Sequence, residues 1–213
     1  MSVMSSPSLR DQHAALGARL TSLQGAEIVV TYGDTSREWR ALVEDVALID
    51  LSALGRIWIR GRDAQDYLHR QTSRAIRDLN VGQGVHAVLM NGQGKTQAEM
   101  ILHRVGEHEF LALTMPSCAD ALAGVLDRFI FSEDCRVERE GADRGMVTVS
   151  GPKSAALMRR WIGWPPDEPG EFDCRLAEIE ALECVVARTG LAGVDGFHLL
   201  ANADAVPRLW QVL

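Results

Sequence analysis

The sequence predicts an α+β protein built from two repeated units, each an antiparallel sheet with helices on one face. Three observations predict this class. A strand, a glycine and the start of a helix occur twice, 90 residues apart. A run of hairpin and strand patterns follows each copy. Each run ends in a helix, and the apolar residues of the two helices correspond at a spacing of 84 residues. With 213 residues, 46% of them hydrophobic, the chain can bury the cores of two such units.

The N-terminal segment, residues 1–54, is expected to pack with the second unit. Its apolar positions recur at steps of three and four, which is typical of an amphipathic helix, and Gly25 would end that helix. These positions are Leu9, His13, Leu16, Leu20 and Leu23. The next elements are predicted as a strand at 28–30, a helix at 38–43 and an extended segment at 47–51.

Residues 55–142 form the first predicted repeat. Alternation at 57–60 indicates a strand, which is followed by Gly61 and a helix that contains Tyr67 and Leu68. The glycines of Asn91–Gly94 suit a hairpin turn. The other predicted elements are strands at 85–90, 100–105 and 110–114, a helix from Leu122 to Phe129, and a strand at 135–138.

Residues 143–213 form the second predicted repeat. Val147–Ser154 matches the first strand, glycine and helix start, and strands are expected at 184–187 and 197–200. Trp164–Glu171, with three prolines, is expected to be a loop. The closing helix runs from Val206 to Leu213, with no following strand like 135–138. This pattern favours a truncated polypeptide, a fragment or a subunit completed by another chain; the alternative is a frayed natural terminus.

Charge and cysteine usage exclude several classes of protein. Lys and Arg total 22 against 29 Asp and Glu, so the net charge of −7 argues against a nucleic-acid partner. No apolar run is long enough to span a membrane, and the first ten residues lack a secretory signal. The four cysteines are widely spaced, which favours reduced thiols in the cytoplasm.

Three motifs that could carry chemistry are incomplete. Gly94-Lys95-Thr96 lacks the first glycine of a phosphate loop, because that position is Leu89, and a strand rather than a helix is expected after it. The histidines at 86, 103 and 108 do not have zinc-ligand spacing, so no metal is expected. Cys118 has no assignable histidine partner, so an inert thiol is the better interpretation.

Glu99 is the carboxylate of greatest interest. Strand alternation places it on the same face as Ile101 and His103, and His86 is the polar residue of the facing hairpin strand. A carboxylate and a histidine on adjacent strands could line a polar pocket. The alternative from spacing alone is an ordinary solvated sheet face.

Four segments resemble one family. Their order and spacing resemble the glycine-cleavage T-protein (aminomethyltransferase) superfamily, whose motifs include D-S-x-x-G, G-p-D-A, N-x-x-G and R-t-G-Y-T-G-E-D-G. The segments are Val46–Ile57, Ile59–Leu68, Leu79–Gly94 and Arg188–Phe197. The superfamily includes aminomethyltransferases, related demethylases and YgfZ-type folate-binding proteins, which support iron–sulfur enzymes. The gamma subunit of heterotetrameric sarcosine oxidase resembles the front of the fold.

The resemblance implies a T-protein-like folate-binding fold that lacks the C-terminal β-barrel. It also implies tetrahydrofolate or a folate derivative as the ligand. Glu99 would be the catalytic carboxylate, in the second position of the family's Asp-Asp pair, with Ala98 in the first. The folate-binding positions would be Leu54, His86, Glu99, His103, Met115 and Val194.

Several of these positions differ from the family pattern. His86 and His103 stand where the family has tyrosines, Met115 where it has asparagine, and Val194 where it has the glutamate that binds the pterin edge. An unpaired pterin donor would cost about 1–3 kcal/mol. The sequence therefore favours a folate-binding protein of the YgfZ/T-protein type.

Two alternatives remain open. The first is a tetrahydrofolate-dependent aminomethyltransferase or demethylase. The second is a non-catalytic subunit resembling the sarcosine oxidase gamma subunit, with a protein partner at the C-terminal helix.

Overall fold

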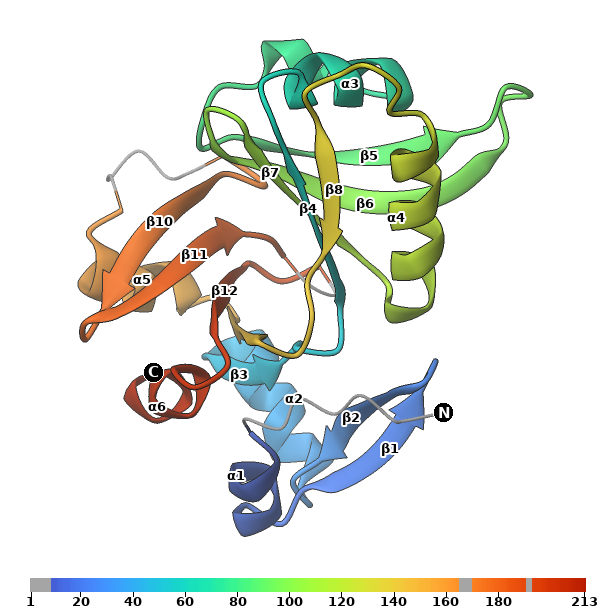
Figure 1. The fold of residues 1–213 in the computed structure, drawn as a ribbon. Coiled ribbons are helices and arrows are strands. Elements are labelled where there is room, and N and C mark those ends of the chain that lie inside the picture. Colours follow the sequence, from blue (N-terminus) through green and yellow to red (C-terminus); the bar gives the residue numbers. More distant parts are fainter. Residues whose placement is uncertain (1–8, 165–169, 191–192) are drawn as a thin grey trace. The chain divides into compact units, whose positions relative to one another are not determined.

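The computed structural model describes residues 9–164, 170–190 and 193–213, and it contains two compact units (Figure 1). Most of the predicted Trp164–Glu171 loop lies outside the described residues. Unit 1 comprises the described residues of Met1–Ala53, Gly141–Glu171 and Arg175–Leu213. Unit 2 comprises Leu54–Glu140 and Phe172–Cys174. No described helix is both long and apolar enough to cross a membrane.

Unit 2 is a five-stranded antiparallel sheet with two helices on one face. The strand order is β5-β6-β7-β4-β8, and α3 and α4 cover the apolar face. The bounds are β4 Gly55–Arg60, α3 Ala64–Gln71, β5 Gly84–Met90, β6 Thr96–Gly106, β7 Glu109–Thr114, α4 Ala119–Arg128 and β8 Arg136–Arg139, with short 3-10 turns at Ile76–Asp78 and Pro116–Cys118.

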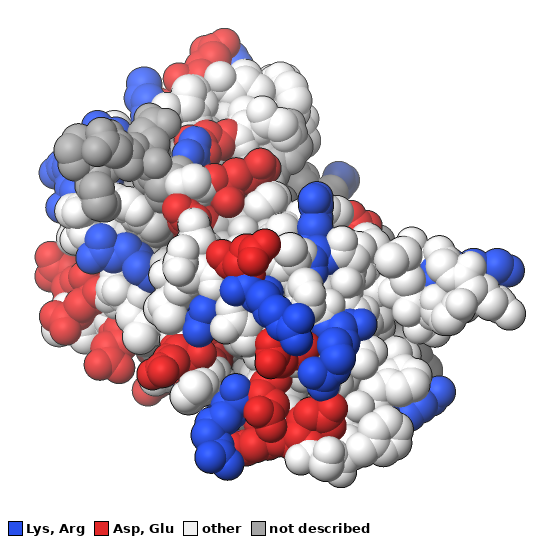
Figure 2. Space-filling view, turned by 90° about the horizontal axis from the view of Figure 1, so that it is seen from above, with Lys and Arg blue, Asp and Glu red and all other residues white. Residues whose placement is uncertain are grey.

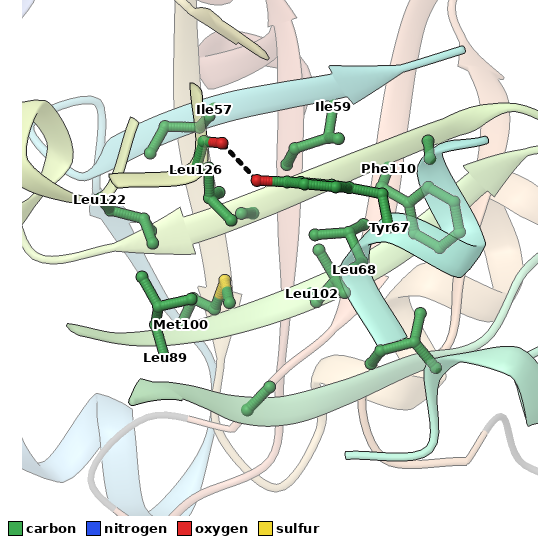
Figure 3. Close-up of a cluster of buried hydrophobic side chains, with 14 of the residues drawn as sticks. Ile57, Ile59, Tyr67, Leu68, Leu89, Met100, Leu102, Phe110, Leu122 and Leu126 are labelled. Atoms are coloured by element: carbon green, nitrogen blue, oxygen red, sulfur yellow. Dashed lines mark hydrogen bonds between the residues drawn. The ribbon is translucent and has the colours of Figure 1, made fainter. Parts of the chain in front are cut away.

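The core of unit 2 forms because alternate strand residues face the two helices (Figure 3). Ile57 and Ile59 of β4 pack with Met100 and Leu102 of β6, and all four are almost completely buried. Tyr67 of α3 is also fully buried, and its hydroxyl donates a hydrogen bond to the backbone carbonyl of Leu126 in α4. This bond satisfies the one polar atom of a large apolar side chain and ties the two helices together.

Unit 1 repeats the same plan. Its sheet order is β10-β11-β12-β9-β3, and α5 and α6 pack on its apolar face. The N-terminal residues add a short helix, a two-stranded hairpin and an amphipathic helix. The bounds are α1 Arg10–Ala15, β1 Arg19–Leu23, β2 Ala26–Thr31, α2 Thr35–Glu44, β3 Ala47–Asp50, β9 Arg144–Ser150, α5 Ser154–Ile162, β10 Cys174–Ile179, β11 Leu182–Arg188, β12 Gly196–Asn202 and α6 Val206–Val212. The predicted α+β class with two antiparallel-sheet repeats is confirmed.

The fifth strand of each sheet comes from the same unit as the other four. β8, expected as the strand at 135–138 of the first repeat, pairs with β4 inside unit 2. β3, from the N-terminal segment, pairs with β9 inside unit 1, although Leu54–Glu140 lies between these two strands in the sequence. The closing strand expected to be missing from the second repeat is therefore supplied by Ala47–Asp50. Pairing across about 90 residues has no local signal, so strand order could not be read from periodicity.

The predicted helix from Leu9 to Leu23 is wrong in its second half. Gly17 has φ +72 and ends α1, because Ala18 N–H bonds to the carbonyl of His13, as in a Schellman cap. Residues 19–23 then form β1, which pairs with β2. Gln24 and Gly25 have φ +53 and +82, the left-handed values of a two-residue hairpin turn.

All four cysteines are free thiols. Cys174 and Cys184 are buried, and burial raises the pKa of each thiol, to about 12 and about 11 respectively. These two residues act as small apolar core groups, as the sequence suggests.

One close backbone approach recurs in both units. Gly61 follows β4 with φ +134, and a Cβ there would clash with the carbonyl of Asp134. Gly151 follows β9 with φ +129, and a Cβ there would clash with the carbonyl of Asp45. Each carbonyl lies two residues before the fifth strand of its sheet, β8 or β3, so only glycine lets that strand enter the sheet.

We expect Gly61→Ala to lower the free energy of unfolding by about 2 kcal/mol or more, because positive φ strain and the clash with Asp134 act together. Gly124→Ala is the matched control, since a Cβ there meets no atom within 4 Å and α4 favours alanine. Urea unfolding measures both variants. Equal stability of the two variants would contradict this account of Gly61.

A short segment, Phe172–Cys174, attaches to unit 2 through the start of β5. The Nδ1–H of His103 donates to the carbonyl of Phe172 over 2.9 Å, and Cys174 N–H donates to the carbonyl of Gly82 over 2.7 Å. Gly84 is required here, because a Cβ would clash with the carbonyl of Phe172. Burial lowers the pKa of His103 to about 4, although its hydrogen bond to Phe172 opposes that change.

This pKa predicts acid sensitivity. The folded protein holds His103 neutral, whereas the unfolded chain protonates near pH 6.5, so the stabilisation is complete above pH 6.5. It is lost as the pH falls towards 4, by about 3 kcal/mol in all. Urea unfolding between pH 7.5 and 4.5 should show a steeper loss for the native chain than for His103→Asn, whose amide can still donate to Phe172. Parallel pH profiles would contradict the prediction.

Candidate functional site

The second face of the unit 2 sheet, opposite α3 and α4, carries most of the predicted site residues. Strand alternation places Glu99, Ile101 and His103 of β6 on this face. Trp58 of β4 and Leu113 of β7 share the face, since their neighbours Ile57, Ile59 and Ala112 belong to the core. The face is therefore mixed, with apolar and aromatic residues beside charged ones.

Glu99 and His86 are in contact on this face. The Nε2 of His86 lies 2.6 Å from the Oε1 of Glu99, on adjacent strands of the β5–β6 hairpin. The side chains are 40% and 68% exposed, so the pair is solvated and contributes little to stability. Glu99 therefore presents a carboxylate that a ligand can reach, with a histidine behind it.

Strand register brings Leu54 and Met115 to the same end of the sheet as Glu99. Gly55 pairs with Thr114, and Ile101 pairs with Leu113. Continuing these registers sets Leu54, Met115 and Glu99 in one row across the sheet. The hydroxyl of Thr114 also donates to the backbone carbonyl of Glu99 over 2.7 Å, which fixes this end of β6.

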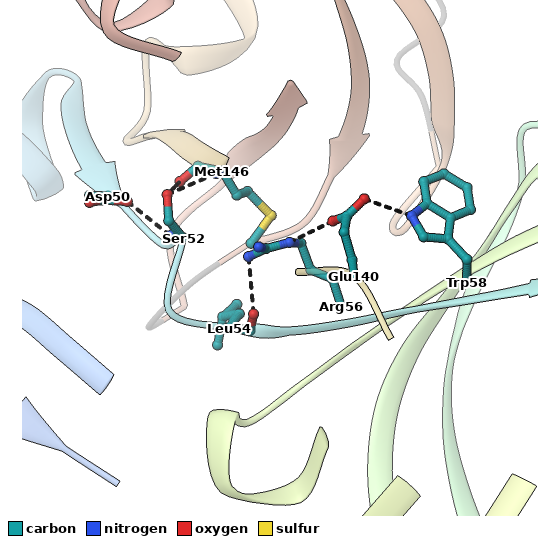
Figure 4. Close-up of polar contacts among 7 residues, drawn as sticks. All are labelled: Asp50, Ser52, Leu54, Arg56, Trp58, Glu140 and Met146. Carbon is teal, nitrogen blue, oxygen red and sulfur yellow. Dashed lines mark hydrogen bonds and ion pairs between the residues drawn. The ribbon is translucent and has the colours of Figure 1, made fainter. Parts of the chain in front are cut away.

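A buried ion pair holds the backbone at Leu54 (Figure 4). Arg56 Nε donates to Glu140 over 2.7 Å, and both side chains are only 5% exposed. The same guanidinium donates through Nη1 to the carbonyl of Leu54 over 3.1 Å. Trp58 Nε1 donates to the other oxygen of Glu140 over 2.7 Å. Because each buried charge is paired and hydrogen-bonded, the network rigidly positions the start of β4.

His103 lies at the opposite end of the same face. Its Nδ1 must carry the proton, because it donates to the carbonyl of Phe172. The Nε2 is then a lone-pair acceptor, and it is buried without a hydrogen-bond partner among the described residues. His103 lies four positions after Glu99 along β6, so the Cα atoms of the two residues are about 13 Å apart.

Val194 belongs to unit 1, where it lines a cavity of about 530 Å³. Arg188 and Asp195 also line this cavity and form an ion pair, with Nε and Oδ1 3.0 Å apart. Val194 itself contributes only an apolar surface to it. Leu191, another departure from the family motif, lies outside the described residues.

Unit 1 contains a polar network that the sequence pattern did not indicate. His13 Nε2 lies 3.0 Å from Asp50 Oδ2, and the hydroxyl of Tyr32 lies 2.9 Å from His13 Nδ1. Burial, followed by the charges of Asp50 and Glu38, raises the pKa of Tyr32 to about 12. His13 occupies an apolar position of the N-terminal pattern, so its spacing gave no sign of this role. These hydrogen bonds connect α1 with β3 and with the residue that follows β2.

Figure 2 shows acidic and basic side chains interleaved over the face it presents. Among residues 9–164, 170–190 and 193–213, no group of three or more His, Cys, Asp and Glu is arranged to hold a metal ion. The second face of unit 2 thus presents the carboxylate of Glu99 beside two apolar side chains, Leu54 and Met115, and a histidine, His86. These groups suit a ligand with N–H donors and a flat apolar body.

Comparisons with known proteins agree with this fold. The family model described as the GCVT N-terminal domain matches residues 9–213. An aminomethyltransferase of Rubrobacter xylanophilus is 28% identical over 205 residues, which are 96% of this chain and 55% of that protein. One of Thermus thermophilus is 29% identical over 202 residues, covering 93% of this chain and 57% of that protein.

Two solved structures are similar in fold. The glycine cleavage system aminomethyltransferase T from Bartonella henselae has a TM-score of 0.86 at 23% identity, over 99% of this chain and 56% of that one. Heterotetrameric sarcosine oxidase from Corynebacterium sp. U-96 has a TM-score of 0.59 at 20% identity, over 80% of this chain and 84% of the matched chain.

The chain thus spans little more than half the length of the curated relatives given above. The family match, in contrast, runs from Leu9 to the last residue of the sequence. The resemblance drawn from the motifs is therefore confirmed, and this chain belongs to the GCVT N-terminal domain family, the aminomethyltransferase-like fold.

Proposed function

We propose that this chain binds tetrahydrofolate or a folate derivative, as a folate-binding protein of the YgfZ/T-protein type. The observation that carries the proposal is the row of Leu54, Met115 and Glu99, backed by His86, on the second face of unit 2. Membership of a family whose relatives are aminomethyltransferases supports a one-carbon carrier as the ligand. A role beside iron–sulfur enzymes or in one-carbon metabolism follows from the YgfZ resemblance.

Each residue has a defined task in this proposal. The Glu99 carboxylate accepts hydrogen bonds from N–H groups of the reduced pterin, and a charged acceptor is worth about 1.5–3 kcal/mol. Leu54 and Met115 provide apolar contact with the flat ring, and Met115 is already 47% exposed. His86 donates a hydrogen bond to Glu99 and holds the Glu99 carboxylate over β5 and β6.

An enzymatic function on the same site is the second candidate. In a tetrahydrofolate-dependent aminomethyltransferase or demethylase, Glu99 would stabilise the cation that develops at the methylene carrier, or relay a proton. The aminomethyltransferase relatives favour this candidate. Ala98 and Val194 weigh against it, because neither provides the carboxylate that the T-protein pattern has there.

A non-catalytic subunit is the third candidate. The matched sarcosine oxidase chain is covered over 84% of its length, so a chain of similar fold occurs in that heterotetrameric protein. In that case the folate site would be a relict, and the chain would act through a protein partner.

Folate binding is tested by calorimetry with tetrahydrofolate under anaerobic conditions. We expect saturable binding that Glu99→Gln weakens by about tenfold or more, since a charged hydrogen bond is lost. The variant should unfold within about 1 kcal/mol of the native chain, because the Glu99–His86 pair is solvated. Glu107→Gln is the matched control. The Glu107 side chain is 83% exposed, and the substitution removes the same charge just beyond the end of β6.

No heat with any reduced folate would refute the proposal. If Glu99→Gln and Glu107→Gln weaken tetrahydrofolate binding equally, the assigned site is refuted. The loss of affinity would then come from the change in net charge alone.

Turnover separates the first two candidates. We expect the chain to bind tetrahydrofolate without forming its methylene derivative, either from dimethylglycine or with glycine-cleavage partner proteins. The methylene product can be followed by chromatography. Product formation that Glu99→Gln abolishes would instead favour the enzyme.

A further inference from the structure

A groove opens in unit 1 between α5 and the edge strand β3. Its cavity volume is about 470 Å³, within the range of ligand sites. Its apolar lining, called here the floor, includes Val46, Leu48, Leu157 and Leu213. Three charged residues, Asp45, Lys153 and Arg160, also line it. Every lining residue lies in unit 1.

The internal repeat shows what normally covers such a groove. Lys153 N–H donates to the carbonyl of Asp45 over 3.2 Å, and in unit 2 Asp63 N–H donates to the carbonyl of Asp134 over 3.1 Å. Val149 pairs with Leu48 just as Ile59 pairs with Val137. The two places are therefore equivalent, with α5 following α3 by 90 residues.

In unit 2 the equivalent place is filled by the loop between α4 and β8. Ile130 packs against the core, and Glu133 forms an ion pair with Arg70 at 2.7 Å. The backbone N–H groups of the loop, led by that of Phe131, lower the pKa of Glu133 to about 2, so the carboxylate is charged. The buried ring of Tyr67 occupies the floor. An apolar residue and a carboxylate three positions later thus cover this site.

Among the described residues of unit 1, no group corresponds to these covering groups. Leu157 stands where unit 2 has Tyr67, which removes an aromatic ring from the floor. The chain enters β3 directly from α2, so no loop like 129–133 precedes the strand. Arg160 is the counterpart of Arg70, and it contacts no acidic side chain in the part of the chain that the structure describes.

We infer that this groove binds a segment of a partner polypeptide, with an apolar side chain on the Leu157 floor and a carboxylate three residues later on Arg160. Charge supports an acidic partner. Asp45 in the same lining is paired with Lys153 at 3.0 Å, whereas Arg160 has no acidic partner among the described residues. Leu157 and Leu213 already provide the apolar surface such an anchor needs. The inference is independent of folate binding, because it uses no residue of the proposed folate site.

The probe is a labelled peptide with the sequence of residues 128–134, which carries the covering residues of unit 2. Fluorescence anisotropy on the full chain should show saturable binding below about 1 mM. Arg160→Gln should weaken binding about fivefold, the value of an exposed ion pair, and Arg159→Gln on the neighbouring exposed position should not. A peptide with Gln in place of Glu133 should lose the same factor and be insensitive to Arg160→Gln.

Leu157→Gln tests the floor, because it replaces the apolar contact of the anchor side chain with an amide and should weaken binding strongly. Arg160→Gln lies on the helix surface and keeps the test valid if Leu157→Gln fails to fold. The inference is overturned by the absence of saturable binding. It is equally overturned if Arg159→Gln and Arg160→Gln weaken binding alike, or if folded Leu157→Gln binds as tightly as the native chain.

Discussion

The approach of one peptide carbonyl to one glycine is the constraint on which both sheets depend. Asp134 reaches Gly61, and Asp45 reaches Gly151, each just before the strand that completes a five-stranded sheet. Because these glycines have no Cβ, β8 can lie beside β4, and β3 can lie beside β9. This pairing covers one edge of β4 and one edge of β9 and leaves the four-residue strands β8 and β3 at the edge. Unit 1 therefore depends on the N-terminal segment, which Leu54–Glu140 separates from the rest of that unit.

The candidate site follows from this arrangement. β4 is a central strand: β7 pairs with all of Gly55–Arg60, and β8 pairs with Ile57–Arg60 on the other side. Glu140, which follows β8, can then reach Arg56 and Trp58 and hold the backbone of Leu54. As a result, Leu54, Met115 and Glu99 form a row across the sheet, and Glu99 lies at its accessible end. The exposed Glu99 adds little to stability, which leaves it free for a ligand.

Local signals predicted much of this structure. Hairpin register depends on a short turn, so the Asn91–Gly94 pattern sufficed to place His86 and Glu99 on one face, and the structure puts them in contact. The two glycines 90 residues apart predicted the duplication. The pairing of β3 with β9 and of β8 with β4 was beyond such signals, because each pair joins segments far apart in the sequence. His13 was missed because a buried histidine at an apolar position looks like any core residue, and its partners Tyr32 and Asp50 come from distant elements.

The central claim is that a ligand of the folate class binds on the second face of unit 2. Amide hydrogen exchange of the full chain, with and without tetrahydrofolate, tests it most directly. The account predicts slower exchange in β5 and β6 around His86 and Glu99, and in the segment from Leu54 into β4. Protection confined to residues 188–196 of unit 1, or no change at any described amide, would contradict it.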